Sequence, residues 1–190
     1  RDLLLAEMTG GHIHLQHVST RFGVEMIRQA RARGVRVSAE ASPHHLILTE
    51  EAVEGYRTEA KMNPPLRTAE DRAAVRAGLA DGTLDVLATD HAPHHYDEKE
   101  AAFIDAPNGI VGLETALGLV LTHVVGEGVI DLPTMVERMS CAPARAFRRR
   151  PRRRGDQPSI YLRGRLRRCR PPGRRTRKAR RRGLHHRRRR

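Results

Sequence analysis

The sequence lacks tryptophan and has only six other aromatic residues and two cysteines in 190 residues. With 38% hydrophobic residues overall, this composition supplies at most one ordinary folded domain. Cys141 and Cys169 form neither a CxxC pair nor a spacing typical of metal ligands. We therefore expect no disulfide framework, as is typical of proteins in a reducing cytoplasm.

A long apolar run is also missing. The most apolar stretch, 110–130, is interrupted by Glu114, His123 and Glu127, whereas a membrane span takes about 20 consecutive apolar residues. These features predict a soluble protein with no membrane partner. Residues 1–8 contain no initiating Met and have the pattern of the end of an amphipathic helix, so we expect no signal peptide and a chain that begins inside a domain.

Acidic residues are almost absent from the last part of the chain. Residues 148–190 hold 22 of the 36 basic residues and one acidic residue, Asp156, whereas residues 1–147 hold 14 basic and 21 acidic residues. Such a segment cannot bury enough apolar surface to fold, and we expect it to be a disordered tail. Two interpretations are a basic arm that binds nucleic acid non-specifically through phosphates and the product of a shifted reading frame. The abrupt change after Phe147, with Tyr161 as the only aromatic residue among the arginines, favours the shifted frame.

The first 147 residues alternate between strand and helix patterns. Alternating apolar residues predict two strands and a short apolar run predicts a third, at 11–18, 35–39 and 84–89. Helical spacing with capping residues predicts helices from Thr20 to Gly34, from Thr68 to Gly82 and over 111–125, with an irregular stretch rich in His and Pro before Thr68.

This order predicts an α/β fold with parallel strands and right-handed crossovers. Three strand-helix units cannot close a (β/α)8 barrel, which takes about 250 residues. The alternatives are a small open sheet or the carboxyl-terminal strands of a partial TIM (β/α)8 barrel. The beginning inside a helix favours the partial barrel, with residues 1–147 as its part of the chain and residues 148–190 as the tail.

Histidines gather where the predicted strands end. Residues 1–147 contain nine of the 11 histidines, and His17, the Pro43-His44-His45 segment and Asp90 each follow a predicted strand. Active-site groups collect at the carboxyl ends of parallel strands. Imidazole and carboxylate are suitable ligands for zinc, so His17 and Asp90 form a chemically sensible ligand pair, although two ligands do not complete a site.

Five motifs stand in one order and spacing along the first 147 residues. They are His17-Val18-Ser19-Thr20, Pro43-His44-His45-Leu46, Lys61-Met62-Asn63-Pro64-Pro65-Leu66-Arg67, Thr89-Asp90-His91-Ala92-Pro93-His94 and Gly109-Ile110-Val111-Gly112-Leu113-Glu114-Thr115. Together they resemble the bacterial class of dihydroorotases in the amidohydrolase superfamily, over about three quarters of the chain. Allantoinases and hydantoinases share the His and Asp at the strand ends, but the Asn-Pro-Pro and Asp-His-Ala-Pro-His motifs are more similar to dihydroorotases.

The resemblance implies a role for six residues. His17 would be the metal-ligating histidine after the sixth barrel strand, and Asp90, after the eighth, would be both zinc ligand and catalytic acid/base. Asn63 and His94 would bind substrate, as would the loop backbone at Asn108 and Gly109, although the family often has a bulkier residue where Asn108 stands. It implies one or two Zn²⁺ ions, dihydroorotate and carbamoyl aspartate as substrates, and a possible homodimer.

Hydrolysis of a ring amide has chemical requirements that these residues meet. A metal ion lowers the pKa of bound water toward about 7 and polarises the carbonyl group. A carboxylate such as Asp90 can accept the proton of that water and deliver it to the leaving ring nitrogen. His94 and the amide of Asn63 are suitable partners for the substrate's carboxylate.

Other family ligands have no counterpart here. The His-x-His of the first strand, a bridging carboxylate, a further His and a substrate-binding Arg would all lie upstream of Arg1, and His12-Ile13-His14 has the right form but follows the wrong strand. His44 and His45 receive no role beyond anchoring a loop or supporting a ligand. We therefore expect a dihydroorotase fragment with little activity by itself; the alternatives are another cyclic amidase (allantoinase or hydantoinase) and a catalytically silent or nucleic-acid-binding protein.

Overall fold

A computed structural model describes residues 1–147, and the predictions made for 148–190 lie outside the described residues. Three strands form one sheet: β1 (His12–Leu15), β2 (Arg36–Ala41) and β3 (Val86–Leu87). Helices precede, connect and follow them: α1 (Asp2–Thr9), α2 (Arg21–Ala32), α3 (Pro43–Ile47), η1 (Glu50–Val53), η2 (Thr58–Ala60), α4 (Ala69–Ala80), α5 (Tyr96–Lys99), α6 (Ala116–Val120), η3 (Leu121–Val125), α7 (Leu132–Val136), η4 (Glu137–Cys141) and α8 (Ala142–Ala146).

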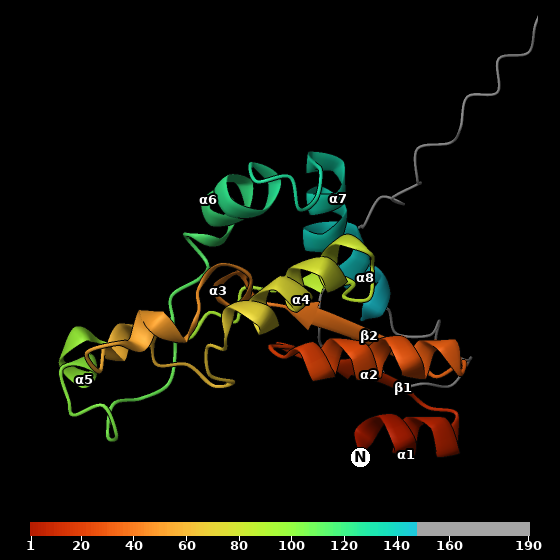
Figure 1. The fold of residues 1–190 in the computed structure, drawn as a ribbon, viewed down its shortest axis with the longest axis horizontal. Coiled ribbons are helices and arrows are strands. Elements are labelled where there is room, and N and C mark those ends of the chain that lie inside the picture. Colours follow the sequence, from red (N-terminus) through yellow and green to blue (C-terminus); the bar gives the residue numbers. More distant parts are fainter. Residues whose placement is uncertain (148–190) are drawn as a thin grey trace, which may run out of the picture. The chain divides into compact units, whose positions relative to one another are not determined.

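The sheet is parallel, in the order β1-β2-β3. In β1 and β2, His12 is paired with Arg36 and Leu15 with Ala39, and in β2 and β3, Ala41 is paired with Leu87. Figure 1 shows α2 running beside β1 and β2, with α4 next to it. The α/β class with parallel strands is confirmed, and none of the helices within residues 1–147 is long and apolar enough to cross a membrane.

The two long connecting helices form where capping residues and apolar spacing predict them. The Thr20 side chain accepts a hydrogen bond from the Gly23 amide at the start of α2, and Thr68 does the same for Asp71 at the start of α4. α2 buries Val24, Ile27 and Ala30, while α4 buries Val75, Gly78 and Leu79. These apolar faces join the strand residues in one core, so burial of the helix faces holds the crossovers against the sheet.

Three local predictions are wrong in extent. The third strand is only two residues long, because the chain between Ala88 and Asp90 leaves the ladder. The stretch predicted to be irregular contains α3, a single turn that begins with Pro43 at its first position and buries His44 and His45. The last predicted helix begins at Ala116 instead of Val111, because Ile110 forms an isolated parallel bridge with His91.

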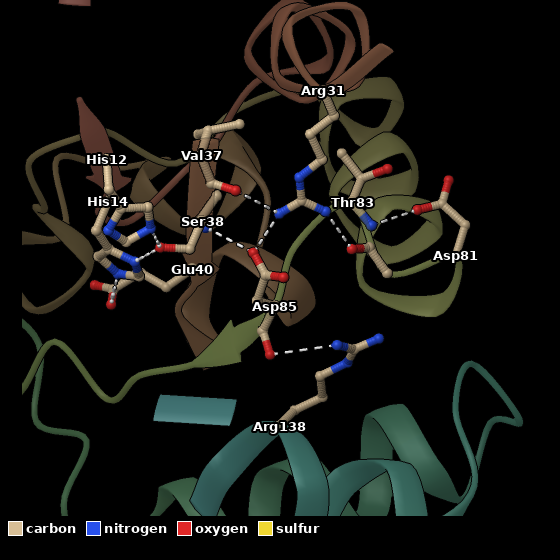
Figure 2. A network of polar contacts seen from close by, with 12 residues as sticks. His12, His14, Arg31, Val37, Ser38, Glu40, Asp81, Thr83, Asp85 and Arg138 are labelled. Carbon is tan, nitrogen blue, oxygen red and sulfur yellow. Dashed lines mark hydrogen bonds and ion pairs between the residues drawn. The ribbon is translucent and has the colours of Figure 1, made fainter. Parts of the chain in front are cut away.

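A cluster of polar contacts joins α2 to the chain just before β3, as Figure 2 shows. The Asp85 carboxylate accepts a 2.9 Å hydrogen bond from the Ala39 amide and pairs with the Arg31 guanidinium. Arg31 also donates to the Gly82 carbonyl at 2.7 Å. Arg31 and Asp85 thus pair with backbone atoms that would otherwise lack a hydrogen bond. These bonds hold the first residues before β3 beside β2.

Gly78 offers a test of how closely α2 and α4 pack. A Cβ placed there would lie 2.8 Å from Val24 Cγ1, whereas a Cβ at Gly118 in α6 would meet nothing within 4 Å. In urea unfolding we expect Gly78→Ala to lower the free energy of unfolding by about 1–3 kcal/mol because of overpacking. Gly118→Ala should raise it by up to about 1 kcal/mol, because alanine is the better helix former. Equal stabilisation by both substitutions would contradict the close packing of α2 on α4.

Candidate active site

His17 and Asp90 lie just beyond the paired ends of the strands on either side of β2. The Val18 amide donates to the Glu40 carbonyl at 2.9 Å, and the Ala88 amide donates to the Ala41 carbonyl at 3.1 Å. Both His17 and Asp90 have positive φ, 36° and 48°. Non-glycine residues rarely adopt this left-handed conformation, and such strain is concentrated at functional sites. The backbone therefore turns sharply out of each strand at the two predicted ligands.

Asp90 faces His44, a residue for which the sequence predicted no role. His44 Nε2 lies 3.9 Å from Asp90 Oδ2, and both atoms are buried without a hydrogen-bond partner within the described residues. The His44 side chain is 5% exposed and that of Asp90 26%. Buried polar atoms without partners are costly and uncommon, so this pair is a candidate for chemistry.

Burial governs the ionisation of the neighbouring histidines. Burial, together with His45 and His17 nearby, lowers the pKa of His44 to about 3. Burial also lowers the pKa of His45, although the bond to the Pro64 carbonyl opposes this shift. Both imidazoles are therefore neutral near pH 7.

His45 anchors a loop, as one of the two interpretations from the sequence proposed. Its Nε2 is 2.9 Å from the Pro64 carbonyl oxygen, next to the cis peptide bond between Asn63 and Pro64. Asn63 itself is exposed, and its side chain makes no hydrogen bond within residues 1–147. The anchored loop thus presents the Asn63 amide to solvent.

The described residues supply part of a metal-binding donor set. His17 offers an imidazole and Asp90 a buried carboxylate oxygen that no hydrogen-bond donor satisfies, and both donor types suit Zn²⁺. No group of three or more His, Cys, Asp or Glu side chains able to hold a metal is found within residues 1–147. The two predicted ligands fit a zinc site but do not complete one.

The other predicted substrate residues meet at a second place. His94 Nε2 is 3.1 Å from the Asn108 carbonyl oxygen and its Nδ1 is 3.2 Å from Glu98 Oε2. Gly109 must be glycine, because its φ is 154° and a Cβ would lie 2.4 Å from the Ala92 carbonyl oxygen. His94 and Gly109 line a cavity of about 580 Å³.

The six predicted residues do not all share one cavity. His17 lines a separate hollow of about 400 Å³ together with Pro64 and Arg67, and neither hollow includes Asn63 or Asp90 in its lining. The structure therefore brings His94, Asn108 and Gly109 together, and places His17 beside the loop that carries Asn63.

The His12-Ile13-His14 segment has hydrogen-bonding partners on the neighbouring strand (Figure 2). His14 binds Glu40 Oε2 at 2.9 Å and Ser38 Oγ at 2.8 Å, and His12 Nε2 lies 3.2 Å from Ser38 Oγ. The buried Glu40 was missed from the sequence. An acidic residue between two alanines, directly after the predicted strand 35–39, was the signal for it.

His91, Lys61 and Lys99 were also missed. His91 Nδ1 accepts hydrogen bonds from the Gly112 and Leu113 amides, both at 3.0 Å, and so holds the start of the last helical segment. Each lysine places its ammonium against three backbone carbonyl oxygens near Asn108 and Gly109. Lys61 and His91 stand inside two of the five motifs, which was the only signal for them. Lys99 lies outside the motifs and gave no signal, since partners in an irregular loop are set by tertiary structure.

The chain is similar to dihydroorotases of several bacteria. It is 59% identical to the dihydroorotase of Pelobacter propionicus over 144 residues, which are 76% of this chain and 34% of that protein. It is 58% identical to that of Geobacter sulfurreducens with the same coverage. The chain therefore spans about a third of the length of the curated relatives it matches. No protein-family model matches it.

Solved structures of cyclic amidases have the same local fold. L-Hydantoinase (dihydropyrimidinase) from Arthrobacter aurescens matches with a TM-score of 0.72 and 37% identity, over 77% of this chain and 33% of that structure. D-Hydantoinase (dihydropyrimidinase) from Thermus sp. matches with a TM-score of 0.71 and 28% identity, over 76% and 33%. Sequence identity to these structures is well below that to the dihydroorotases.

The burial of His44 predicts a pH-dependent stability. Because its folded pKa is depressed below the ordinary value of 6.5 to about 3, unfolding takes up a proton between these values. The His44 contribution to stability is therefore full above about pH 6.5 and declines as the pH falls, by up to about 1.4 kcal/mol per pH unit. Urea unfolding between about pH 7 and pH 4 should show a shallower decline for His44→Gln. His123→Gln, where the side chain is 41% exposed, should change the slope less than His44→Gln does, and an unchanged slope in His44→Gln would contradict the burial of a neutral His44.

Proposed function

Since the chain is a homologue of the dihydroorotases, we propose that it forms the carboxyl-terminal part of a zinc-dependent dihydroorotase site, which interconverts dihydroorotate and N-carbamoyl-aspartate. The observation that carries this proposal is 59% identity over 144 residues to a dihydroorotase, against 37% or less to the hydantoinase structures cited above. The positions of His17 after β1 and of Asp90 after β3, at the same end of the parallel sheet, support it, because active-site residues of parallel α/β enzymes come from there.

The proposed metal ligands from this chain are His17 and Asp90. A bound Zn²⁺ supplies a hydroxide at neutral pH and polarises the scissile carbonyl group. The proposal includes donors from outside residues 1–147, because tetrahedral or five-coordinate zinc needs more than two protein ligands. In the proposed architecture, β1, β2 and β3 are the last three strands of a TIM barrel.

Asp90 is the proposed acid/base. Neither of its carboxylate oxygens makes a hydrogen bond within the described residues, so one oxygen is available to the zinc ion while the other can accept the proton of the attacking water. Delivery of that proton to the ring nitrogen balances the cleavage, since the amide C–N bond breaks as the C–O bond forms. His44 lies 3.9 Å from the Asp90 carboxylate and is neutral. It therefore adds no positive charge that would compete with the metal ion or the proton for this carboxylate.

The proposed substrate contacts come from Asn63, His94 and the backbone at Asn108 and Gly109. The exposed Asn63 amide can donate to a substrate oxygen. His94 is held by Glu98 and the Asn108 carbonyl, so the imidazole and the loop backbone are fixed relative to each other. Because both nitrogens of the His94 ring have partners, the proposed substrate carboxylate takes the place of one of them at this oriented imidazole.

A hydantoinase or allantoinase activity is the second candidate. The TM-scores of 0.72 and 0.71 against hydantoinases favour it, since those structures share the fold of about three quarters of this chain. A cytoplasmic location and a homodimer remain predictions. The catalytically silent or nucleic-acid-binding alternative depends on residues 148–190, which lie outside the described part of the chain.

A segment exchange tests the proposed activity. Residues 1–147 are grafted into Geobacter sulfurreducens dihydroorotase in place of the matching segment, and turnover is measured with dihydroorotate, a hydantoin and allantoin. We expect turnover of dihydroorotate alone, and a loss of at least about a thousandfold in Asp90→Asn, because the amide cannot accept the proton. Asp81→Asn, which changes an exposed carboxylate at the end of α4, is the matched control.

Two results would contradict the proposal. Turnover of the hydantoin in preference to dihydroorotate would favour the second candidate, and retained turnover in Asp90→Asn would remove the assigned acid/base. The 190-residue chain by itself is expected to show no measurable turnover, because its described residues hold only part of the zinc ligand set.

A further inference from the structure

Two lysine ammonium groups bind the backbone of the loop that carries Asn108 and Gly109. Lys61 Nζ lies 2.6 Å from the carbonyl oxygen of Phe103, 3.1 Å from that of Ile104 and 2.5 Å from that of Ala106. Lys99 Nζ lies 3.1 Å from the carbonyl oxygen of Thr58, 2.9 Å from that of Pro107 and 2.8 Å from that of Gly109. We call residues 103–109 with these two side chains the lysine clasp.

Each ammonium in the lysine clasp has a full set of partners. A lysine carries three N–H donors, and each lysine here faces three carbonyl oxygens. Hydrogen bonds from a charged donor are about twice as strong as neutral ones. These carbonyl groups lie outside strands and long helices, so the lysines supply donors that regular structure would otherwise provide.

Apolar burial contributes little to the order of this loop. Within 101–110 only Ala106 and Gly109 are buried. The Lys61 ammonium lies 5.3 Å from the centroid of the Phe103 ring, which also makes an edge contact with the Tyr56 ring at a centroid distance of 6.0 Å. The Gly109 amide also donates to the Lys61 carbonyl at 2.9 Å. Polar contacts to Lys61 and Lys99 therefore define the conformation of the loop.

The lysine clasp reaches the proposed substrate contacts directly. Gly109 is bound on both sides, through its amide to Lys61 and through its carbonyl to Lys99. The neighbouring Asn108 carbonyl binds His94 Nε2. Displacing the loop would move the Asn108-Gly109 backbone and remove one of the two contacts that orient His94.

We propose that Lys61 and Lys99 are positioning residues that hold the Asn108-Gly109 backbone and His94 in place before substrate binds. This inference rests on the proposed function, since it assigns the loop to substrate binding. The lysines act through the loop and need no contact with substrate, because both ammonium groups are already saturated by carbonyl oxygens. Preorganisation of this kind improves affinity by removing the ordering cost of the loop from the binding step.

Hydrogen exchange on the 190-residue chain tests the clasp without any activity. The Asp105 and Ala106 amides donate to the Ala102 carbonyl and the Gly109 amide to the Lys61 carbonyl, all at 2.9 Å, so these three amides report on the loop. We expect Lys61→Met and Lys99→Met to speed their exchange by about tenfold or more. Unchanged exchange in both variants would overturn the proposal.

Arg57→Met is the matched control for the loss of a cation. Arg57 lines the cavity of about 580 Å³ that Lys99, His94 and Gly109 also line. Its side chain makes no hydrogen bond or ion pair within residues 1–147. We expect its exchange at Asp105, Ala106 and Gly109 to equal that of the wild type. If Arg57→Met speeds the exchange of these amides as much as the lysine variants do, then any positive charge near the cavity orders the loop. That result would also contradict the proposal.

Kinetics of the grafted dihydroorotase separate positioning from a merely structural role. In Lys99→Met we expect the KM for dihydroorotate to rise by about tenfold with kcat changed less than threefold, because the loop must be ordered on binding. Alkylation of Lys99→Cys with 2-bromoethylamine rebuilds an ammonium side chain and should restore KM, whereas iodoacetamide should not. Wild-type protein treated with each reagent controls for the other cysteines.

The outcomes distinguish the two proposals. An inactive wild-type graft contradicts the proposed function and the positioning role with it. An active graft whose KM is unchanged in Lys99→Met contradicts the positioning role alone, even if loop exchange is faster.

Discussion

The pairing of β2 with a parallel strand on each side is the constraint on which the candidate site depends. β2 accepts the Val18 amide at one edge and the Ala88 amide at the other, so the chain leaves both neighbouring strands at the same end of the sheet. His17 stands directly before Val18 and Asp90 two residues after Ala88, each in a left-handed backbone conformation. Burial of the α2 and α4 faces against this sheet holds the arrangement, since a three-stranded sheet needs a covering layer to be stable.

Charged groups have different roles within the sheet and beyond its strands. The Asp85 and Arg31 cluster satisfies backbone atoms and fixes the chain before β3, and His14 and Glu40 satisfy each other across β1 and β2. Beyond the strands, His44 Nε2 and Asp90 Oδ2 are among the buried side-chain atoms that have no hydrogen-bond partner within the described residues. This pair lies where the chemistry is proposed.

Local signals made much of the fold predictable. Thr20 and Thr68 cap their helices as expected, and strand alternation located β1 and β2, because these patterns depend on neighbouring residues alone. The extent of β3, the α3 turn at His44 and the bridge at Ile110 were not predictable, because each depends on a partner far along the chain. The site residues came from motif resemblance, whereas the pairing of His44 with Asp90 and the lysine clasp required the tertiary structure.

We propose that the parallel pairing of β1 and β3 with β2 brings His17 and Asp90 to one zinc ion. The most direct measurement is an anomalous difference map, at the zinc edge, of crystals of the grafted dihydroorotase. We expect a zinc peak about 2.0–2.2 Å from an imidazole nitrogen of His17 and from a carboxylate oxygen of Asp90. A zinc peak that lacks either ligand would contradict it.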